Sequence, residues 1–95
     1  MLSTLGVENR IKVALSLMNC SINQFVSITK AISQQRLSAA LNGEKALSNE
    51  VGTMLEEHIR ELQELVESYK PISIDFRNVT GVQLALHQRR NNKAA

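Results

Sequence analysis

Residues 21–43 read SINQFVSITKAISQQRLSAALNG and contain the start and stop signals of two short helices. Ser21 and Gln24 have the spacing of a capping box, in which each side chain accepts the backbone N–H of the other residue. A second helix is expected to begin at Ser33 and to end at the Asn-Gly pair that closes the stretch. Only about three residues separate the two helices, so they cannot lie antiparallel and must cross steeply.

Both flanks of this pair are also predicted to be helical. An apolar stripe at helical spacing predicts a first helix that starts at Thr4 or Gly6 and ends at Met18. The longest helix is expected to follow its cap Ser48 and to end at Tyr69, because Lys-Pro comes next. Hydrophobic residues make up 43% of the 95 residues and aromatic residues only 3%, which favours helix-on-helix packing. We therefore expect a single all-α domain of four to five helices.

The tail after the proline is predicted to form a strand-like segment and a weak fifth helix. Ile72 and Ile74 provide the alternation of a short extended stretch. Asp75 is expected to cap the fifth helix, which Gly81 weakens. The apolar face of that helix would consist of Phe76, Val79, Val82 and Leu86. Residues 91–95 are predicted to be a frayed basic tail.

Cys20 is the only cysteine, so an intrachain disulfide is excluded and a reducing compartment fits. Cys20 and Phe25 occupy the positions of a hydrophobic staple around the capping serine. The thiol is therefore expected to pack as a small apolar side chain. No apolar run reaches the length of a membrane span or of a signal-peptide core. We expect a cytoplasmic protein that makes no membrane contact.

Charge is distributed unevenly along the chain, although the net charge is only +2. Residues 1–43 carry four basic and one acidic side chain, and residues 70–95 carry five basic and one acidic. Residues 44–69 carry seven glutamates and two basic side chains. A polyanion would be attracted to the two ends and repelled by the middle. The same pattern is also typical of a solvated acidic helix between weakly basic ends.

Residues 26–43 resemble the DNA-binding helix-turn-helix of phage repressors of the lambda repressor and Cro type. That family has a small residue facing the turn, another in the turn, and a branched aliphatic residue that begins the inner face of the recognition helix. Ser27, Ala31 and Leu37 occupy these places. Ala31 replaces the usual Gly, which tolerates positive φ, and Lys30 stands where the family usually has an apolar residue. A turn one residue longer than the family standard would rotate the preceding helix.

This resemblance covers the first half of the chain and implies a helix-turn-helix at about residues 21–43 within a domain of residues 1–70, followed by a C-terminal extension of residues 71–95. It also implies a sequence-specific transcriptional regulator of phage or prophage type, associated with the bacterial nucleoid through duplex DNA. The helix from Ser33 to Leu41 would enter the major groove. Its outer face has no acidic residue, and glutamine can pair with adenine while basic side chains contact phosphates. The expected DNA contacts are Asn23, Gln24, Ser33, Gln34, Gln35, Arg36, Ser38, Asn42 and Lys45.

A homodimer is expected because one recognition helix covers only a few base pairs. Surplus apolar surface lies in the C-terminal half, where the tail of one chain would pack on the long helix of its partner. The expected dimer residues are Leu62, Val66, Tyr69, Ile72, Ile74, Phe76 and Val79. Glutamates along the long helix would repel a partner unless Arg77, Arg89 or Arg90 lies between the two helices. The alternative is a monomer whose tail folds back on its own chain.

Catalytic and cofactor-binding patterns are not found in the sequence. No histidine pair or cysteine cluster has metal-ligand spacing, and no glycine-rich phosphate loop occurs. His58 lies on the apolar side of the long helix and is expected to be a partly buried packing residue. We therefore expect neither enzymatic activity nor a cofactor, metal or small-molecule substrate. The alternative function is a protein-interaction module, of an antirepressor or inhibitor kind, built on the same helices.

Overall fold

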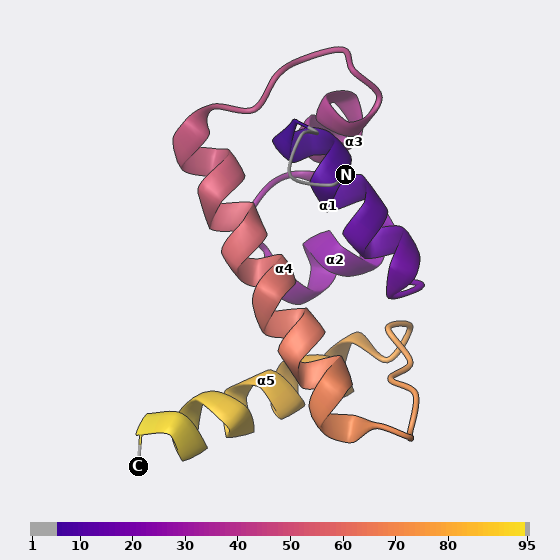
Figure 1. Cartoon of the computed structure of the whole chain (residues 1–95), viewed down its shortest axis with the longest axis vertical. Helices are drawn as coiled ribbons and strands as arrows, with labels where there is room; N and C mark the ends of the chain where they lie inside the picture. The colour runs from indigo at the N-terminus through magenta and orange to yellow at the C-terminus, as the bar shows by residue number, and fades with distance from the viewer. Residues whose placement is uncertain (1–5, 95) are drawn as a thin grey trace.

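The computed structural model describes residues 6–94, without the side chains of the last two, and contains five helices in that range (Figure 1). They are α1 (Val7–Leu17), α2 (Ile22–Thr29), α3 (Gln34–Leu41), α4 (Asn49–Tyr69) and α5 (Val79–Ala94). No strand occurs in this part of the chain. The predicted all-α class is therefore confirmed. A helix start at Thr4 lies outside the described residues, within which α1 follows Gly6.

Serine side chains cap α2, α3 and α4 where the sequence predicts helix starts. Ser21 Oγ accepts the Gln24 N–H (3.1 Å) and Gln24 Oε1 accepts the Ser21 N–H (3.0 Å), so the capping box is complete. Ser33 Oγ accepts the Arg36 N–H at 3.2 Å, and Ser48 caps α4 in the same way. Each cap joins residues three positions apart, which is why these starts are visible in the sequence.

α1 and α2 meet at a corner of 97°. Asn19 lies in this corner with φ of 58°, a left-handed conformation that asparagine adopts more readily than most residues. Only as this bent pair do the two helices have the length and composition of a membrane span. No single helix among residues 6–94 is long and apolar enough to cross a membrane.

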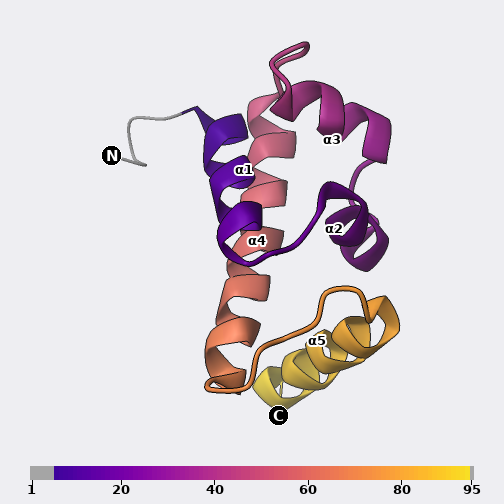
Figure 2. The ribbon, with the colours of Figure 1, turned by 90° about the vertical axis from the view of Figure 1, so that its right-hand side faces the viewer.

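One hydrophobic core joins all five helices. Its centre consists of fully covered side chains such as Phe25, Leu37 and Leu55 from α2, α3 and α4. The tail contributes Phe76, Val82 and Leu86 to the same core. α5 packs against both α2 and α4, and Figure 2 shows it below α2 at the foot of α4. The tail therefore folds back on its own chain, and residues 71–94 belong to the same packing unit as the rest.

This packing corrects part of the expected dimer surface. Leu62 and Phe76 are buried in the core of their own chain, so neither side chain is available to a partner. Three others, Val66, Ile74 and Val79, are partly buried against that core. Only Tyr69 and Ile72 of the expected set are exposed large hydrophobic residues. The sequence pattern identifies apolar residues but not which apolar surface covers them.

The start of α5 differs from the prediction. Asn78, not Asp75, caps it: Asn78 Oδ1 accepts the Gly81 N–H at 3.0 Å. Asp75 instead accepts the N–H and the guanidinium of Arg77, each at 3.0 Å. Residues 71–78 form a loop without a strand, and α5 continues to Ala94 where a frayed tail was expected. The absence of a side chain at Gly81 makes room for the cap, because a Cβ there would lie 2.4 Å from the Asn78 amide nitrogen.

Ion pairs connect the basic end of α5 to acidic α4. Arg89 Nη2 lies 3.2 Å from Glu64 Oε1, and Arg90 Nε donates to Glu61 Oε2 at 2.9 Å. Arg89 and Arg90, which were expected to lie between two chains, therefore neutralise glutamates of their own chain, while Arg77 pairs with Asp75. Both pairs are partly exposed to solvent, so each contributes about 1 kcal/mol or less to stability.

Candidate nucleic-acid interface

Four residues, Lys30 to Ser33, separate α2 from α3. Lys30 ends α2 in a left-handed conformation with φ of 52°, and its N–H donates to Val26 O at 2.8 Å. The resemblance implied positive φ at Ala31, but the residue with positive φ is Lys30. Ser27 is exposed, so it is not the point at which α3 approaches α2 closely. The three residues between Thr29 and the cap Ser33 are those expected, and Lys30 takes the left-handed conformation because it directly follows the last residue of α2.

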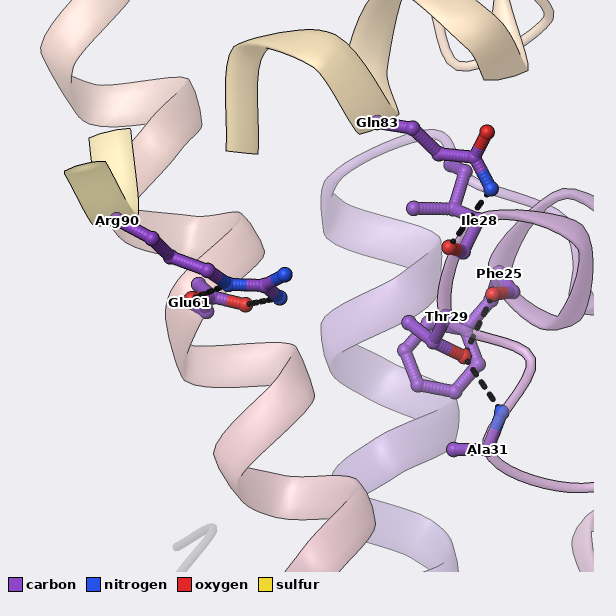
Figure 3. Close-up of polar contacts among 7 residues, drawn as sticks. All are labelled: Phe25, Ile28, Thr29, Ala31, Glu61, Gln83 and Arg90. Atoms are coloured by element: carbon purple, nitrogen blue, oxygen red, sulfur yellow. Dashed lines mark hydrogen bonds and ion pairs between the residues drawn. The ribbon is translucent and has the colours of Figure 1, made fainter. Parts of the chain in front are cut away.

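Side chains from two helices support this turn (Figure 3). Thr29 Oγ1 donates to Phe25 O at 2.9 Å, and the Ala31 N–H reaches Thr29 Oγ1 at 3.5 Å. Gln83 of α5 donates through Nε2 to two carbonyl oxygens at the end of α2, those of Ser27 (3.1 Å) and Ile28 (3.2 Å). Gln83 is missed in the sequence analysis because it lies 55 residues from Ile28 along the chain.

α3 has an inner apolar face and an outer polar face. Leu37, Ala40 and Leu41 are buried, as predicted. Gln34, Gln35 and Arg36 are consecutive, exposed, and make no side-chain hydrogen bond or ion pair within the described part of the chain. Figure 2 shows α3 at the top of the molecule, with its N-terminal end directed away from α4. The three free side chains thus lie at the outward end of the helix.

The remaining expected contact residues surround this end or lie further along. Ser33 is exposed and caps α3, while Ser38 is half-buried. Asn42 and Lys45 are exposed after the end of α3, and Asn23 is exposed on α2. Gln24 is half-buried and its carbonyl oxygen is used by the capping box, which leaves its amide NH₂ group as a donor.

Positive charge on this side of the molecule comes from fewer residues than the sequence count suggests. Arg10 forms a two-bond ion pair with Glu56 (2.9 and 3.0 Å), and this bond lowers the pKa of the Glu56 carboxyl. Lys30 and Arg36 are exposed, and residues 30–43 contain no acid. Lys30, treated above only as a departure from the family pattern, is thus a candidate phosphate contact at the turn.

The loop after α3 is held by a carboxylate from α1. Glu8 Oε2 accepts the Leu47 N–H at 2.9 Å, and this bond lowers the pKa of the Glu8 carboxyl. The bond joins residues 39 positions apart, so it fixes the path by which the chain leaves α3 and enters α4. Lys45, two residues before Leu47, lies in this loop and is exposed.

Metal-ligating and nucleophilic side chains form no further candidate site among residues 6–94. No group of three or more metal-ligating side chains occurs there. His58 is half-buried, which agrees with its predicted role as a packing residue. Cys20 is buried, and burial raises its pKa to about 11, which suppresses the reactive thiolate. A cleft of about 770 Å³ lies between the α1–α2 corner and residues 73–77 and has no lining residue from α3.

Comparison of the chain with protein-family models, with curated proteins and with solved structures gave no match. The candidate interface is therefore argued from the residues of this chain: a short helix with a buried inner face, an outward N-terminal end, and the exposed cations Lys30 and Arg36 in a stretch, residues 30–43, that contains no acid.

Proposed function

We propose that this protein is a sequence-specific duplex-DNA-binding transcriptional regulator of phage or prophage type, with α2 and α3 as a helix-turn-helix. The observation that carries the proposal is the run Gln34, Gln35 and Arg36. These side chains are exposed, have no partner within the described residues, and lie at the N-terminal end of α3. A recognition helix offers this end to base edges in the major groove.

Each of the three side chains has a role in this proposal. Gln34 and Gln35 read bases, because a glutamine amide can bond both N6 and N7 of adenine. Arg36 contacts phosphates, and Lys30 and Lys45 do so from the turn and from the loop after α3. Phosphate contacts position the helix without reading sequence. The glutamates of α4 repel DNA less than their number suggests, because Glu56, Glu61 and Glu64 are paired with arginines.

We further propose that two copies bind together over adjacent half-sites, since one short helix contacts too few base pairs for specificity. Tyr69 (43% exposed) and Ile72 (69% exposed) are the expected dimer residues that their own chain leaves uncovered. Both line a groove of about 250 Å³ at the α4–α5 end, with Ile74, Val82 and Ala85. A projecting side chain beside a groove suits a two-fold contact, in which each copy supplies both.

Binding-site selection from random duplexes, followed by mobility shifts, tests the reading role. We expect Gln34→Ala and Gln35→Ala each to cost about 1–3 kcal/mol on the selected site. Gln63→Ala, which removes an exposed glutamine from α4, is the control and should bind like the parent. Affinity should fall steeply with salt because phosphate contacts release counterions. Unchanged site preference in the Gln34→Ala, Gln35→Ala double variant would exclude α3 as the reader.

The alternative, a protein-interaction module, gives a different outcome in the same assays. It predicts no selected duplex and capture of a protein whose binding is insensitive to salt. The dimer is tested separately by light scattering at micromolar concentration. Ile72→Arg should give a monomeric mass where the parent gives a dimer, while a monomeric parent would reject the pairing.

A further inference from the structure

Gln83 supplies hydrogen bonds that α2 cannot make for itself. The last four carbonyls of any α-helix lack partners within the helix, and α2 has only eight residues. Val26 O accepts the Lys30 N–H, but Ser27 O and Ile28 O both accept from Gln83 Nε2 of α5. The donor therefore comes from the far end of the chain, and Figure 3 shows it reaching the end of α2 just before the turn.

The turn has one short backbone hydrogen bond, from the Lys30 N–H to Val26 O (2.8 Å), and Ala31 and Ile32 are partly buried against the core. Lys30 occupies a left-handed conformation, which costs free energy for residues other than glycine. The bond from the Ala31 N–H to Thr29 Oγ1 is long, at 3.5 Å. Gln83, in contrast, projects from a helix that is anchored by the buried side chains of Val82 and Leu86. The contact therefore joins α5, which is anchored in the core, to the final carbonyls of α2 directly before the turn.

We infer that Gln83 is a positioning residue, which sets the direction of α3 by holding the end of α2. This inference rests on the proposed function for its effect on DNA binding. Base contacts need two well-aligned hydrogen bonds, whereas phosphate contacts are made by flexible basic side chains. A shift of α3 therefore weakens binding to the selected site more than binding to unrelated duplex.

The measured quantity is the ratio of affinities for the selected and an unrelated duplex. Gln83→Ala should lower this ratio roughly tenfold while leaving the salt dependence unchanged. Gln88→Ala removes an exposed glutamine from the same helix and should leave the ratio unchanged. Gln83→Lys should restore it, because an ammonium group can donate to the final carbonyls of a helix. The charge added by lysine raises both affinities and so cancels in the ratio.

Amide hydrogen exchange without DNA separates this inference from the proposed function. Exchange of the Lys30 and Ala31 amides should accelerate in Gln83→Ala but not in Gln88→Ala. If the parent binds no duplex, faster exchange still supports the role of Gln83 in ordering the turn, and only the proposed function is rejected. An unchanged affinity ratio in a Gln83→Ala variant that binds duplex, with or without a lower melting temperature, overturns the inference. Unchanged exchange at both amides overturns it as well.

Discussion

The two ends of the molecule use their polar side chains differently. At the α4–α5 end, Arg89 and Arg90 are paired with Glu64 and Glu61 of the neighbouring helix. At the α3 end, the polar run of residues 34–36 has no side-chain partner within residues 6–94. The first set contributes to the fold, whereas the second set has no such role and is exposed to solvent. This difference is a stronger argument for α3 as the candidate interface than the net charge of +2.

The largest effect is expected when the chain is truncated so that α5 and its ion pairs with α4 are lost. A chain ending at Lys70 loses Phe76, Val82 and Leu86, all of which are buried in the common core. Large-to-small changes at single buried sites cost about 2–5 kcal/mol, and a small domain has a stability of only about 5–15 kcal/mol. We expect the truncated chain to lose its cooperative thermal transition, followed by circular dichroism. A cooperative transition in residues 1–70 would show that the tail is a separate unit.

The next test separates the two faces of α3. Leu37 is fully buried and Arg36, its neighbour in sequence, is exposed. Leu37→Ala should lower the free energy of unfolding by about 2–5 kcal/mol in urea titrations. Arg36→Ala should change that free energy by less than about 0.5 kcal/mol and weaken DNA binding instead. Equal destabilisation by both variants would contradict the assignment of faces.

Most features that could be predicted from the sequence depend on residues that are close together in the chain. Caps such as that of Ser21 with Gln24 need only residues three positions apart, so the starts of α2, α3 and α4 are readable. The start of α5 was misplaced because Asp75 and Asn78 are both good capping residues, and Arg77 captures the aspartate. The residue with positive φ was also misassigned: the family pattern places it at Ala31, whereas the structure has it at Lys30, directly after the last residue of α2.

The contacts that were missed join distant segments. Gln83 lies 55 residues from Ile28, and Glu8 lies 39 residues from Leu47. Helical spacing places Phe76 and Leu62 on apolar faces. It does not indicate whether the surface that packs against them belongs to the same chain or to a second one. The candidate recognition residues were located from sequence because they belong to a single short helix, whereas the residues that hold this helix in place were not.

A smaller effect is expected at the turn, where stability and binding should move in opposite directions. Lys30→Gly relieves the left-handed conformation and should stabilise the protein by about 0.5–1 kcal/mol. The same change removes a proposed phosphate contact, so the slope of log affinity against log salt should fall by about 1. Ala31→Gly is the control, because Ala31 has no positive φ and should gain no stability. A gain at Ala31 and not at Lys30 would restore the register implied by the family pattern.

The smallest effect concerns the carboxylates that tie α1 to its neighbours. The pKa of Glu8 lies below its ordinary 4.5 mainly because Glu8 accepts the Leu47 N–H, and that of Glu56 does so mainly because of its bond from Arg10. A carboxyl whose pKa is lower in the folded state than in the unfolded state favours folding above the unfolded value. This contribution is lost as the pH falls through the folded value.

Stability should therefore decrease as the pH is lowered below about 4.5, in proportion to these two groups among others. Urea titrations of Glu8→Gln at pH 7 and pH 3.5 should show a smaller difference in unfolding free energy than the parent, by less than about 1 kcal/mol. Glu57→Gln removes an exposed carboxylate of α4 that has no hydrogen-bond partner within the described residues, and its pH response should follow the parent. If Glu8→Gln also follows the parent, the bond to Leu47 does not help hold the loop beside α3. The loop would then have to be held by the packing of the half-buried Leu47 side chain against the core.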